Sequence, residues 1–504
     1  MRRLSIVDIA GGHQPLANER DDVWTVFNGE IYNHPALLAH LVARGHQLRS
    51  RCDTEVLVHL YEDYGDELVH ALEGMFAFAL WDVGRRRLLL ARDRFGEKPL
   101  FYARRPGAGV VFASELTAET RRLLDASVRA RLVADVPVGV FLSGGVDSTL
   151  VATLAAEAAA RPLKTFTVGY DVGSVNETDA ARRLARELGT EHHELVCSER
   201  DVAERVPALL GRLDQPLADQ AVVPLHALSE FARHEVKVVM GGEGADELFG
   251  GYPRYRWLER RARVAGVLPP LPIADGAQRA RTALSPRTNR LIDLATGGGL
   301  LERHVDWVTA RRRHLRTMVY GARLAPAAGS TAVVDSLDGH VRGNGNGSSA
   351  GRLMRLDQLH WLPDDVLMKA DRASMLVGLE MRTPYLQREL AEFAATVGTP
   401  THLAGHGKHL LRRLVGQLHP AGRERRRKTA FRTPGADWLR GPLRSVLAEQ
   451  VAQGSIFAEG WFDRAGVARL VADHDVGRGD RSQALWPILA FGLWLDRLRG
   501  RDVQ

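Results

Sequence analysis

The sequence predicts an α/β protein in which an antiparallel-sheet domain precedes a parallel-sheet domain. Before about residue 115, short β-type runs alternate with turns, as in an antiparallel sheet. From about residue 120, apolar strands are followed by amphipathic helices, an order that produces a parallel sheet covered on both faces. From residue 254 the pattern is mainly helical. We therefore expect two domains, at residues 1–118 and 119–504.

In the first domain the sequence predicts four short strands and two helices. The strands are expected at 23–27, 88–91, 100–102 and 110–113. Asn28-Gly29 follows the first strand and indicates a turn. The helices are expected near 34–45 and 53–72.

In the second domain the sequence predicts a parallel sheet that binds ligands at the carboxyl ends of its strands. The strands are expected at 138–142, 165–170, 193–196 and 236–240, with helices at 176–189 and 221–234 between them. Further helices begin near Leu362 and Gly407, and the glycine- and asparagine-rich stretch 329–351 is expected to be a loop.

The composition predicts a cytoplasmic protein with no membrane or nucleic-acid partner. The sequence has no run of eighteen apolar residues, and its start at Arg2-Arg3 has no apolar signal core. Its two cysteines fit a reducing compartment. The formal net charge of +7 comes mostly from scattered arginines. The densest basic run, 423–428, is expected to be a solvated helix end or a patch near phosphates rather than an RNA site.

The most informative segment joins the strand at 138–142 to a helix through Ser143-Gly144-Gly145-Val146-Asp147-Ser148. Two glycines let successive backbone N–H groups point at one place, and the helix that starts near Ser148 adds the positive end of its dipole. The segment therefore predicts a phosphate-binding loop. It is not a Walker loop, because no lysine follows the glycines. The alternative is a strand-to-helix turn that needs glycine only for its backbone.

Acidic residues in two glycine-rich loops predict a Mg2+ site. Asp147 would repel bound phosphates unless Mg2+ lay between them. A second loop, 241–252, follows the strand at 236–240 of the same sheet. There we expect Asp246 to be a second Mg2+ ligand and Glu243 to be a general base. Alternatively, these acidic residues cap the start of a helix at 245.

Lys408 follows a glycine at the start of a predicted helix. The helix dipole disfavours a cation at that end. Lys408 is therefore either a functional cation that stabilises charge on a phosphate or an ordinary surface lysine.

Many ordered strings of the chain resemble the glutamine-dependent asparagine synthetase family, over nearly its whole length. The matching strings are Arg3-Leu4-Ser5-Ile6-Val7-Asp8, Asn28-Gly29-Glu30-Ile31-Tyr32-Asn33, Asp53-Thr54-Glu55-Val56, 74–79, 91–96, 112–115, 142–148, 242–252 and 364–375. The resemblance implies a glutaminase domain of the αββα, N-terminal-nucleophile type, coupled by an ammonia channel to a Rossmann-like ATP pyrophosphatase domain with a helical C-terminal part. It also implies a reaction that needs ATP and Mg2+. In that reaction the side-chain carboxylate of aspartate attacks the α-phosphorus to give β-aspartyl-AMP and pyrophosphate, and ammonia then displaces AMP.

The resemblance also implies roles for individual residues. Those expected to contact ATP are Leu142, Ser143, Gly144, Gly145, Asp147, Ser148, Val168, Gly241 and Gly242. The family has serine where this chain has Gly241. Glu243 resembles a residue needed to form aspartyl-AMP, and Lys408 matches the lysine of a Lys-x-x-Leu-Arg motif. Those expected to hold glutamine are Arg3, Leu4, Ser5, Ile6, Val7, Asn28, Gly29, Glu30 and Asp53.

Two departures from the family pattern concern the first domain. The family nucleophile is a cysteine that becomes residue 1 after removal of Met and is activated by its own free amine. This chain starts inside the family pattern at Arg2, and Cys52 and Cys197 are internal. After Glu115 the chain reaches Arg129 almost directly, where the family has several dozen residues. We therefore predict a truncated glutaminase domain that lacks strands at both ends and does not hydrolyse glutamine.

The leading hypothesis is an asparagine synthetase-type ligase whose partners are small molecules: aspartate or a related carboxylate, and ammonia or glutamine. One alternative is a relative that joins an internal amine to the adenylate and forms a lactam or a cyclic peptide. Gln387, where the family usually has aspartate, is compatible with such a changed acceptor pocket. Another alternative is a non-catalytic remnant with a dimerisation or regulatory role, so a homodimer is among the expected partners. A tRNA-modifying pyrophosphatase is disfavoured, because it would not need Asn28 to Glu30 or Asp53.

Overall fold

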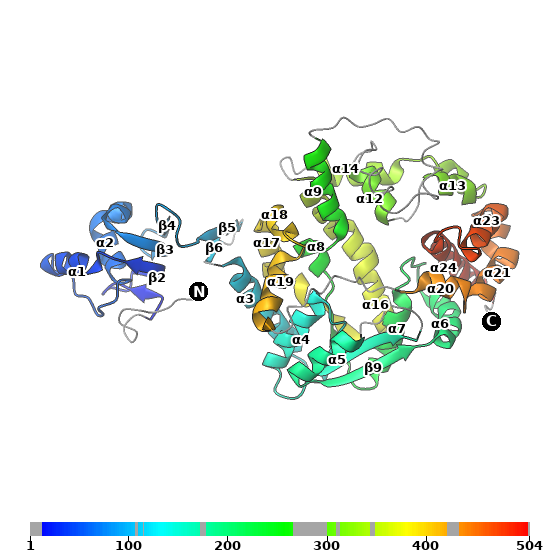
Figure 1. Ribbon diagram of the computed structural model, residues 1–504, viewed down its shortest axis with the longest axis horizontal. Helices are drawn as coiled ribbons and strands as arrows, with labels where there is room; N and C mark the ends of the chain where they lie inside the picture. The colour runs from blue at the N-terminus through cyan, green and yellow to red at the C-terminus, as the bar shows by residue number, and fades with distance from the viewer. Residues whose placement is uncertain are drawn as a thin grey trace. The chain divides into compact units, whose positions relative to one another are not determined.

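The computed structural model describes residues 13–105, 109–113, 115–171, 178–265, 300–308, 313–342, 348–420 and 433–501 (Figure 1). The chain divides into two compact units, Met1–Leu123 and Leu124–Gln504. Each unit has its own hydrophobic core. Among the described residues, no helix combines the length and the apolar character that crossing a bilayer requires.

In the described part of the first unit, four antiparallel strands form a sheet with the order β1-β2-β3-β4. Its strands are β1 (Leu16–Ala17), β2 (Val23–Ile31), β3 (Gly74–Asp82) and β4 (Arg87–Arg92). The core of the unit brings Phe27 and Phe78 of the sheet together with Leu57 and Leu60 of helix α2. The other elements are α1 (His34–Ala43), α2 (Val56–Tyr64), a 3-10 turn at Gly65–Ala71 and the hairpin β5 (Phe101–Arg105) and β6 (Gly109–Ala113).

Two expectations for this unit are wrong. Strand β2 continues through Asn28-Gly29 to Ile31 instead of turning there. A Cβ at Gly29 would lie 2.1 Å from the Met75 carbonyl oxygen, so this glycine allows a close approach of β3 rather than a turn. The single helix expected near 53–72 is interrupted at Gly65, which adopts the left-handed region with a φ of 57°.

The second unit contains the predicted parallel sheet, with five strands in the order β11-β10-β7-β8-β9. The strands are β7 (Val138–Phe141), β8 (Lys164–Tyr170), β9 (Glu191–Cys197), β10 (Val238–Met240) and β11 (Glu380–Arg382). From β7 the chain moves outward to β8 and β9, and it then returns to add β10 on the other side of β7. The strand order therefore reverses between β7 and β10, and this switch point is where open α/β sheets bind ligands.

Helices cover both faces of the parallel sheet, as predicted. Helices α4 (Val146–Ala158) and α5 (Thr178–Leu188) connect β7, β8 and β9, whereas α6 (Glu199–Arg212) and α7 (Val222–Arg233) lead back to β10. Crossovers between parallel strands are right-handed, and the chain crosses the sheet in opposite directions in these two parts. The helix pair α4 and α5 therefore lies on one face of the sheet and the pair α6 and α7 on the other. Figure 1 shows a group of C-terminal helices beside α6. This group consists of α20 (Gly435–Arg440), α21 (Arg444–Gln453), α22 (Ser455–Ala458), α23 (Arg464–Asp475) and α24 (Ser482–Leu498). Trp486 of α24 is buried in the core of this unit.

The other helices include α3 (Leu116–Leu132) and α8 (Ala245–Phe249), which precede residue 253, and a series that begins at Pro253, as expected for the region from residue 254. This series includes α9 (Pro253–Ala265), α12 (Leu300–Val308), α13 (Arg313–Val319), α14 (Ala332–Arg342), α15 (Ser349–Leu356), the π-helical segment Asp357–Leu367, α16 (Met368–Met375), α17 (Arg388–Thr396), α18 (Thr399–Leu403) and α19 (His409–Leu418).

The prediction of a loop at 329–351 is wrong over much of this range, because α14 and the start of α15 lie there. Leu337 of α14 is buried in a small core with Leu301, Val305 and Leu353. Tertiary burial of this apolar face outweighs the low helix propensity of the neighbouring glycines. Residues 343–347, which include the Gly-Asn-Gly core of the predicted loop, lie outside the described residues.

Candidate functional site

Three of the predicted site residues meet at the switch point. Asp147 lies in the first turn of α4 and Asp246 in the first turn of α8. The Lys408 ammonium donates a hydrogen bond to Asp147 Oδ2 and another, 2.8 Å long, to Asp246 Oδ1. The two aspartates converge because β7 and β10 are adjacent parallel strands, so the loops that follow them leave the same edge of the sheet.

Lys408 is a buried cation, so the surface-lysine alternative is wrong. Its side chain is only 2% exposed. Its backbone adopts the left-handed region, with a φ of 50°, and its N–H donates to the Phe249 carbonyl at 3.1 Å. Burial alone would lower the pKa of Lys408, but Asp147 and Asp246 outweigh it and raise the pKa above its ordinary value. Lys408 therefore holds a positive charge between the two acidic loops.

The predicted phosphate loop is already folded into its turn. Gly144 has a φ of 70°, and a Cβ there would lie 2.8 Å from Ala180 Cβ, so both backbone and packing require glycine. The N–H groups of Ser143 and Gly145 donate to Ser148 Oγ (3.2 Å) and Ser143 Oγ (3.3 Å). The turn leads into the thirteen-residue helix α4, whose N-terminus attracts anions.

The other residues predicted to contact ATP lie on strands of the same sheet or directly after them. Leu142 is buried and its N–H donates to the Phe166 carbonyl at 2.8 Å. Val168 is 6% exposed and belongs to the core around β8. A Cβ at Gly242 would lie 2.9 Å from Asp147 Cβ, which shows how closely the two loops approach.

Gly241 has no N–H to offer a ligand, because that group donates to the Arg382 carbonyl at 2.9 Å. A Cβ at this position would lie 2.1 Å from both Glu243 Oε2 and Met381 Cε. The serine of the family pattern would therefore require Glu243 and Met381 to move.

Glu243 is a buried carboxyl group with a raised pKa, which is a property of general acids and bases. Its Oε2 is buried and accepts no hydrogen bond within the described part of the chain. Burial raises the pKa of Glu243, the charges of Asp147 and Asp246 raise it further, and Lys369 opposes them. A carboxyl group that titrates above its usual range is suited to general acid–base work.

Sequence reasoning assigned no role to a second charged cluster beside Glu243. Lys369 Nζ lies 2.5 Å from Asp219 Oδ2. Burial alone would lower the pKa of Lys369, but Asp219 and Asp365 outweigh it and raise the pKa. Burial raises the pKa of Asp365, and the charge of Asp219 adds to this. The spacing of Asp365 and Lys369, four residues apart in one helical stretch, is the signal that could have indicated part of this cluster.

Glu247, in α8, is predicted to make stability depend on pH. It is 1% exposed and accepts a 2.6 Å hydrogen bond from Tyr252. Burial and the charge of Asp246 raise the pKa of Glu247 to about 7. Because the folded state holds this proton more tightly than the unfolded state, the stabilisation is lost as the pH rises from about 4.5 through 7. Between pH 5 and pH 8, we expect the unfolding free energy of the parent to fall by about 2 kcal/mol more than that of Glu247→Gln, which keeps an acceptor for Tyr252.

The measurement is urea unfolding of both proteins at pH 5 and pH 8. Glu449→Gln, an exposed change on α21, is the matched control and should follow the parent. Parallel pH dependence of the parent and Glu247→Gln would contradict the assignment of this titration to Glu247.

In the first unit, the structure brings the described residues of the predicted glutamine site together. Asn28, Gly29 and Glu30 lie on β2, and the buried Asp53 accepts a 3.1 Å hydrogen bond from the Ile31 N–H through Oδ2. The other predicted members, Arg3, Leu4, Ser5, Ile6 and Val7, lie outside the described residues.

Neither cysteine has the surroundings of a reactive nucleophile. Cys52 and Cys197 are both buried and form no disulfide. Burial raises the pKa of the Cys197 thiol to about 11, which keeps it protonated.

Gln387 makes contacts that give it a structural role. Its Oε1 accepts a 3.0 Å hydrogen bond from Arg131, and its Nε2 donates to Glu389 at 2.7 Å. The amide therefore links the end of α3 to α17.

The fold and the site define a doubly wound protein with a glycine loop and an acidic loop at its switch point, preceded by an antiparallel-sheet domain. The chain belongs to the asparagine synthetase family: the family model for asparagine synthase matches residues 119–496, and the glutamine amidotransferase domain model matches residues 1–137. These matches confirm the predicted family and fold class, and they support an asparagine-forming ligase.

Two curated relatives illustrate the similarity. The chain is 28% identical over 575 residues to glutamine-hydrolyzing asparagine synthetase 1 of Bacillus subtilis, covering 98% of this chain and 88% of the relative. It is 35% identical over 307 residues to glutamine-hydrolyzing asparagine synthetase 3 of Arabidopsis thaliana, covering 50% of this chain and 52% of the relative.

Proposed function

We propose that this protein adenylates the side-chain carboxylate of aspartate with ATP and transfers the acyl group to ammonia, producing asparagine, AMP and pyrophosphate. The observation that carries the proposal is the convergence of Asp147, Asp246 and Lys408 at the switch point of a family member. This arrangement presents a cation and two carboxylates beside a preformed phosphate loop.

In the first step, the carboxylate oxygen of aspartate forms a bond to the α-phosphorus and the bond to pyrophosphate breaks. The glycine loop 143–148 and the N-terminus of α4 would hold the departing phosphates. Lys408 would stabilise the negative charge that builds up on the α-phosphate, and its burial strengthens this interaction.

In the second step, the nitrogen of ammonia forms a bond to the acyl carbon and AMP leaves. The attacking nitrogen must then lose a proton. Glu243 is our candidate to accept it, because its carboxyl group is held near the site with a raised pKa.

The site fits Mg2+ as a partner of ATP. Asp147 Oδ2 and Asp246 Oδ1 both reach one ammonium nitrogen, so these two carboxylates are close enough to share a cation. We expect them to hold Mg2+, which when bound would neutralise phosphate charge.

We further propose that residues 1–118 form a remnant glutaminase domain and that residues 119–504 form the synthetase domain, which uses free ammonia. Both cysteines of the chain are internal and buried, so neither presents an exposed thiol for glutamine hydrolysis. The alignment with the Bacillus subtilis relative spans 575 positions although this chain has 504 residues, which supports an internal shortening.

The test is the release of pyrophosphate and AMP with ATP, Mg2+ and aspartate, comparing ammonium chloride with glutamine as the nitrogen source. Asp147→Ala is the inactive control. We expect turnover with ammonium alone. Turnover with glutamine would contradict the loss of glutaminase activity, and a folded protein without aspartate-dependent pyrophosphate release would favour another carboxylate substrate or a non-catalytic role.

A glycine beside the site provides a steric test of the same proposal. A Cβ at Gly251 would lie 1.8 Å from Asp246 Oδ1 and 2.2 Å from Lys408 Cε. We expect Gly251→Ala to displace these groups and reduce pyrophosphate release on the order of 10²-fold. Gly416→Ala is the matched control, because a Cβ there has no atom within 4 Å and the residue lies within α19. Equal rates for the two variants would contradict the assigned position of the site.

A further inference from the structure

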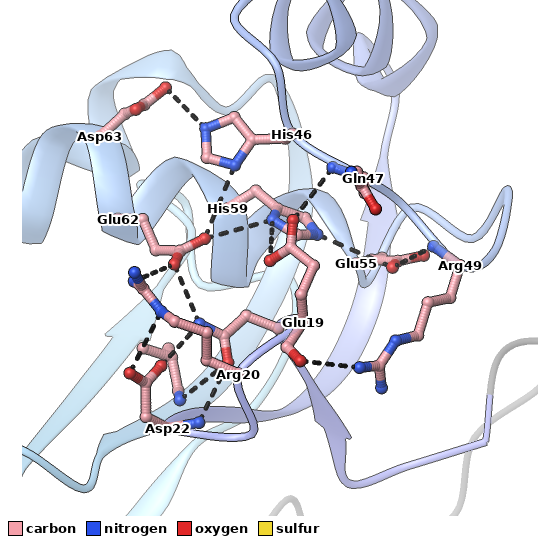
Figure 2. Close-up of polar contacts among 12 residues, drawn as sticks. Glu19, Arg20, Asp22, His46, Gln47, Arg49, Glu55, His59, Glu62 and Asp63 are labelled. Carbon is pink, nitrogen blue, oxygen red and sulfur yellow. Dashed lines mark hydrogen bonds and ion pairs between the residues drawn. The ribbon is translucent and has the colours of Figure 1, made fainter.

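A cluster of histidine and glutamate side chains in the first unit is not used by the proposed reaction (Figure 2). Glu19 lies in the loop between β1 and β2, His46 in the loop after α1, and His59 and Glu62 on α2. One ligand atom from each of Glu19, His46 and His59 lies within 4.8 Å of the other two. His59 is fully buried, while Glu19 and His46 are half-buried.

The spacing of these atoms resembles that of the ligands of a four-coordinate metal. His59 Nδ1 lies 3.5 Å from Glu19 Oε2 and 3.3 Å from Glu62 Oε2, and His46 Nδ1 lies 3.6 Å from the same Glu62 oxygen. In a tetrahedral zinc site with bonds of about 2.0–2.1 Å, neighbouring ligand atoms are about 3.3–3.4 Å apart. These three distances are close to that spacing, and the ligand atoms of Glu19, His46 and His59 all lie within 4.8 Å of one another.

The outer contacts orient the rings as in known metal sites, where a ligating histidine uses its second nitrogen to contact a carboxylate. His46 Nε2 lies 3.3 Å from Asp63 Oδ2, and His59 Nε2 lies 3.7 Å from Glu55 Oε1. Figure 2 shows both Nδ1 atoms directed toward the space between the two rings, Glu19 and Glu62.

Hydrogen bonds also fix the orientation of the Glu62 carboxylate. Its Oε1 accepts hydrogen bonds from Arg20 at 2.6 Å and from Asn18 at 3.0 Å, which leaves Oε2 to face the rings.

Hydrogen bonds alone do not satisfy the centre of the cluster. His59 Nδ1 can carry one proton, but carboxylates of both Glu19 and Glu62 face it. The arginines that pair with the surrounding carboxylates, Arg20 and Arg44, are 69% and 50% exposed and lie at the rim. The carboxylates around the two rings are those of Glu19, Glu55, Glu62 and Asp63.

The excess of carboxylates favours a cation at the centre, and imidazole nitrogen favours a transition metal over Mg2+ or Ca2+. We propose that Glu19, His46, His59 and Glu62 bind one Zn2+ ion as a structural site in the first unit. The ion would connect the β1–β2 loop, the loop after α1, and α2, three segments that are separate in the sequence.

A second group of this kind, Glu191, His193 and Glu235, is a weaker candidate. Lys164 forms ion pairs with both glutamates, at 3.4 Å from Glu191 and in direct contact with Glu235. Both glutamates are exposed, and exposed acidic groups of this kind are common without a metal ion, so this group serves as an internal comparison.

The test uses the full-length chain, stripped of metal with a chelator and then titrated with Co2+ as a spectroscopic substitute for Zn2+. We expect one equivalent of Co2+ to bind with the visible absorption bands of a four-coordinate ion and to be displaced by Zn2+. His46→Ala should remove these bands, and Glu19→Gln should weaken binding at least tenfold. His40→Ala, an exposed histidine on α1, and His193→Ala should leave the titration unchanged.

A stability measurement separates a metal site from a network of ion pairs. Zn2+ should raise the Tm of the parent and of His40→Ala but not that of His46→Ala. No stoichiometric Co2+ binding to the parent, or binding that survives both His46→Ala and Glu19→Gln, would overturn the proposal. The cluster would then be a buried ion-pair network in which a protonated His59 is surrounded by carboxylates. Because the ligands lie far from the ATP-binding residues in sequence and the readout is metal binding, this result is independent of the synthetase assay.

Discussion

Replacing Lys408 with alanine is expected to reduce aspartate-dependent pyrophosphate release by about 10²–10³-fold, the cost of removing one well-placed charge from a transition state. The loss should appear mainly in kcat, because the charge on the α-phosphate increases as the reaction proceeds. The variant also leaves Asp147 and Asp246 without the cation that they share, so we expect lower stability as well. Steady-state kinetics at saturating ATP and aspartate measure the first effect.

Arg413→Ala is the matched control, because Arg413 is an exposed cation on the same helix, α19. It should retain the parental rate. Lys408→Arg tests geometry rather than charge: Gly251 and Asp246 surround the lysine stem closely, and the larger guanidinium should restore little activity. A Lys408→Ala variant within tenfold of the parental kcat would show that Lys408 only maintains the fold.

Replacing Asp357 with alanine is expected to cost about 3–5 kcal/mol of unfolding free energy, the range for breaking a buried ion pair. Asp357 is fully buried and lies 2.8 Å from Arg254, whose side chain is 17% exposed. Its Oδ2 also accepts a hydrogen bond from the buried Tyr255. Arg254 lies 4.2 Å from the centre of the Tyr252 ring, so the unpaired charge could not move freely into water. Urea unfolding of the full-length protein measures the loss.

Two further variants are needed to interpret the loss of stability in Asp357→Ala. Asp357→Asn removes the charge but keeps an oxygen that accepts the hydrogen bond from Tyr255. It should therefore lose less unfolding free energy than Asp357→Ala. Glu449→Ala changes an exposed carboxylate on α21 and should stay within about 0.5 kcal/mol of the parent. If Asp357→Ala were no less stable than Glu449→Ala, the network around Arg254 would not support the fold.

The parallel sheet could be predicted because its central strands are apolar runs followed by amphipathic helices. Strand β11 could not, since Glu380–Arg382 is short and polar and pairs only because β10 is already in place. Strand β3 was also missed. Its run Phe76-Ala77-Phe78-Ala79-Leu80 is buried on both faces and lacks the alternation that marks a half-exposed strand.

Individual site residues were predictable where a local motif carried the chemistry. Asp147 and Asp246 each lie in a glycine-rich loop directly after a strand, so the topology of the sheet was enough to bring them together. The pairing of Lys369 with Asp219 joins positions 150 residues apart and follows no local pattern. Gln387 shows the opposite case: the family pattern related it to the acceptor pocket, and the structure adds contacts with Arg131 and Glu389 that no motif predicts.

The ion pair between Lys408 and Asp147 spans 261 positions of the chain. During synthesis, the acidic loops emerge from the ribosome long before the lysine that balances their charge. Until then, Asp147 and Asp246 repel each other, and strand β10 has no β11 to pair with at its outer edge. Contacts of such long range form slowly, because closing the intervening chain costs entropy before any contact is gained. The centre that would activate a carboxylate is therefore expected to be among the last parts of the protein to be assembled, and an incomplete chain would not consume ATP there.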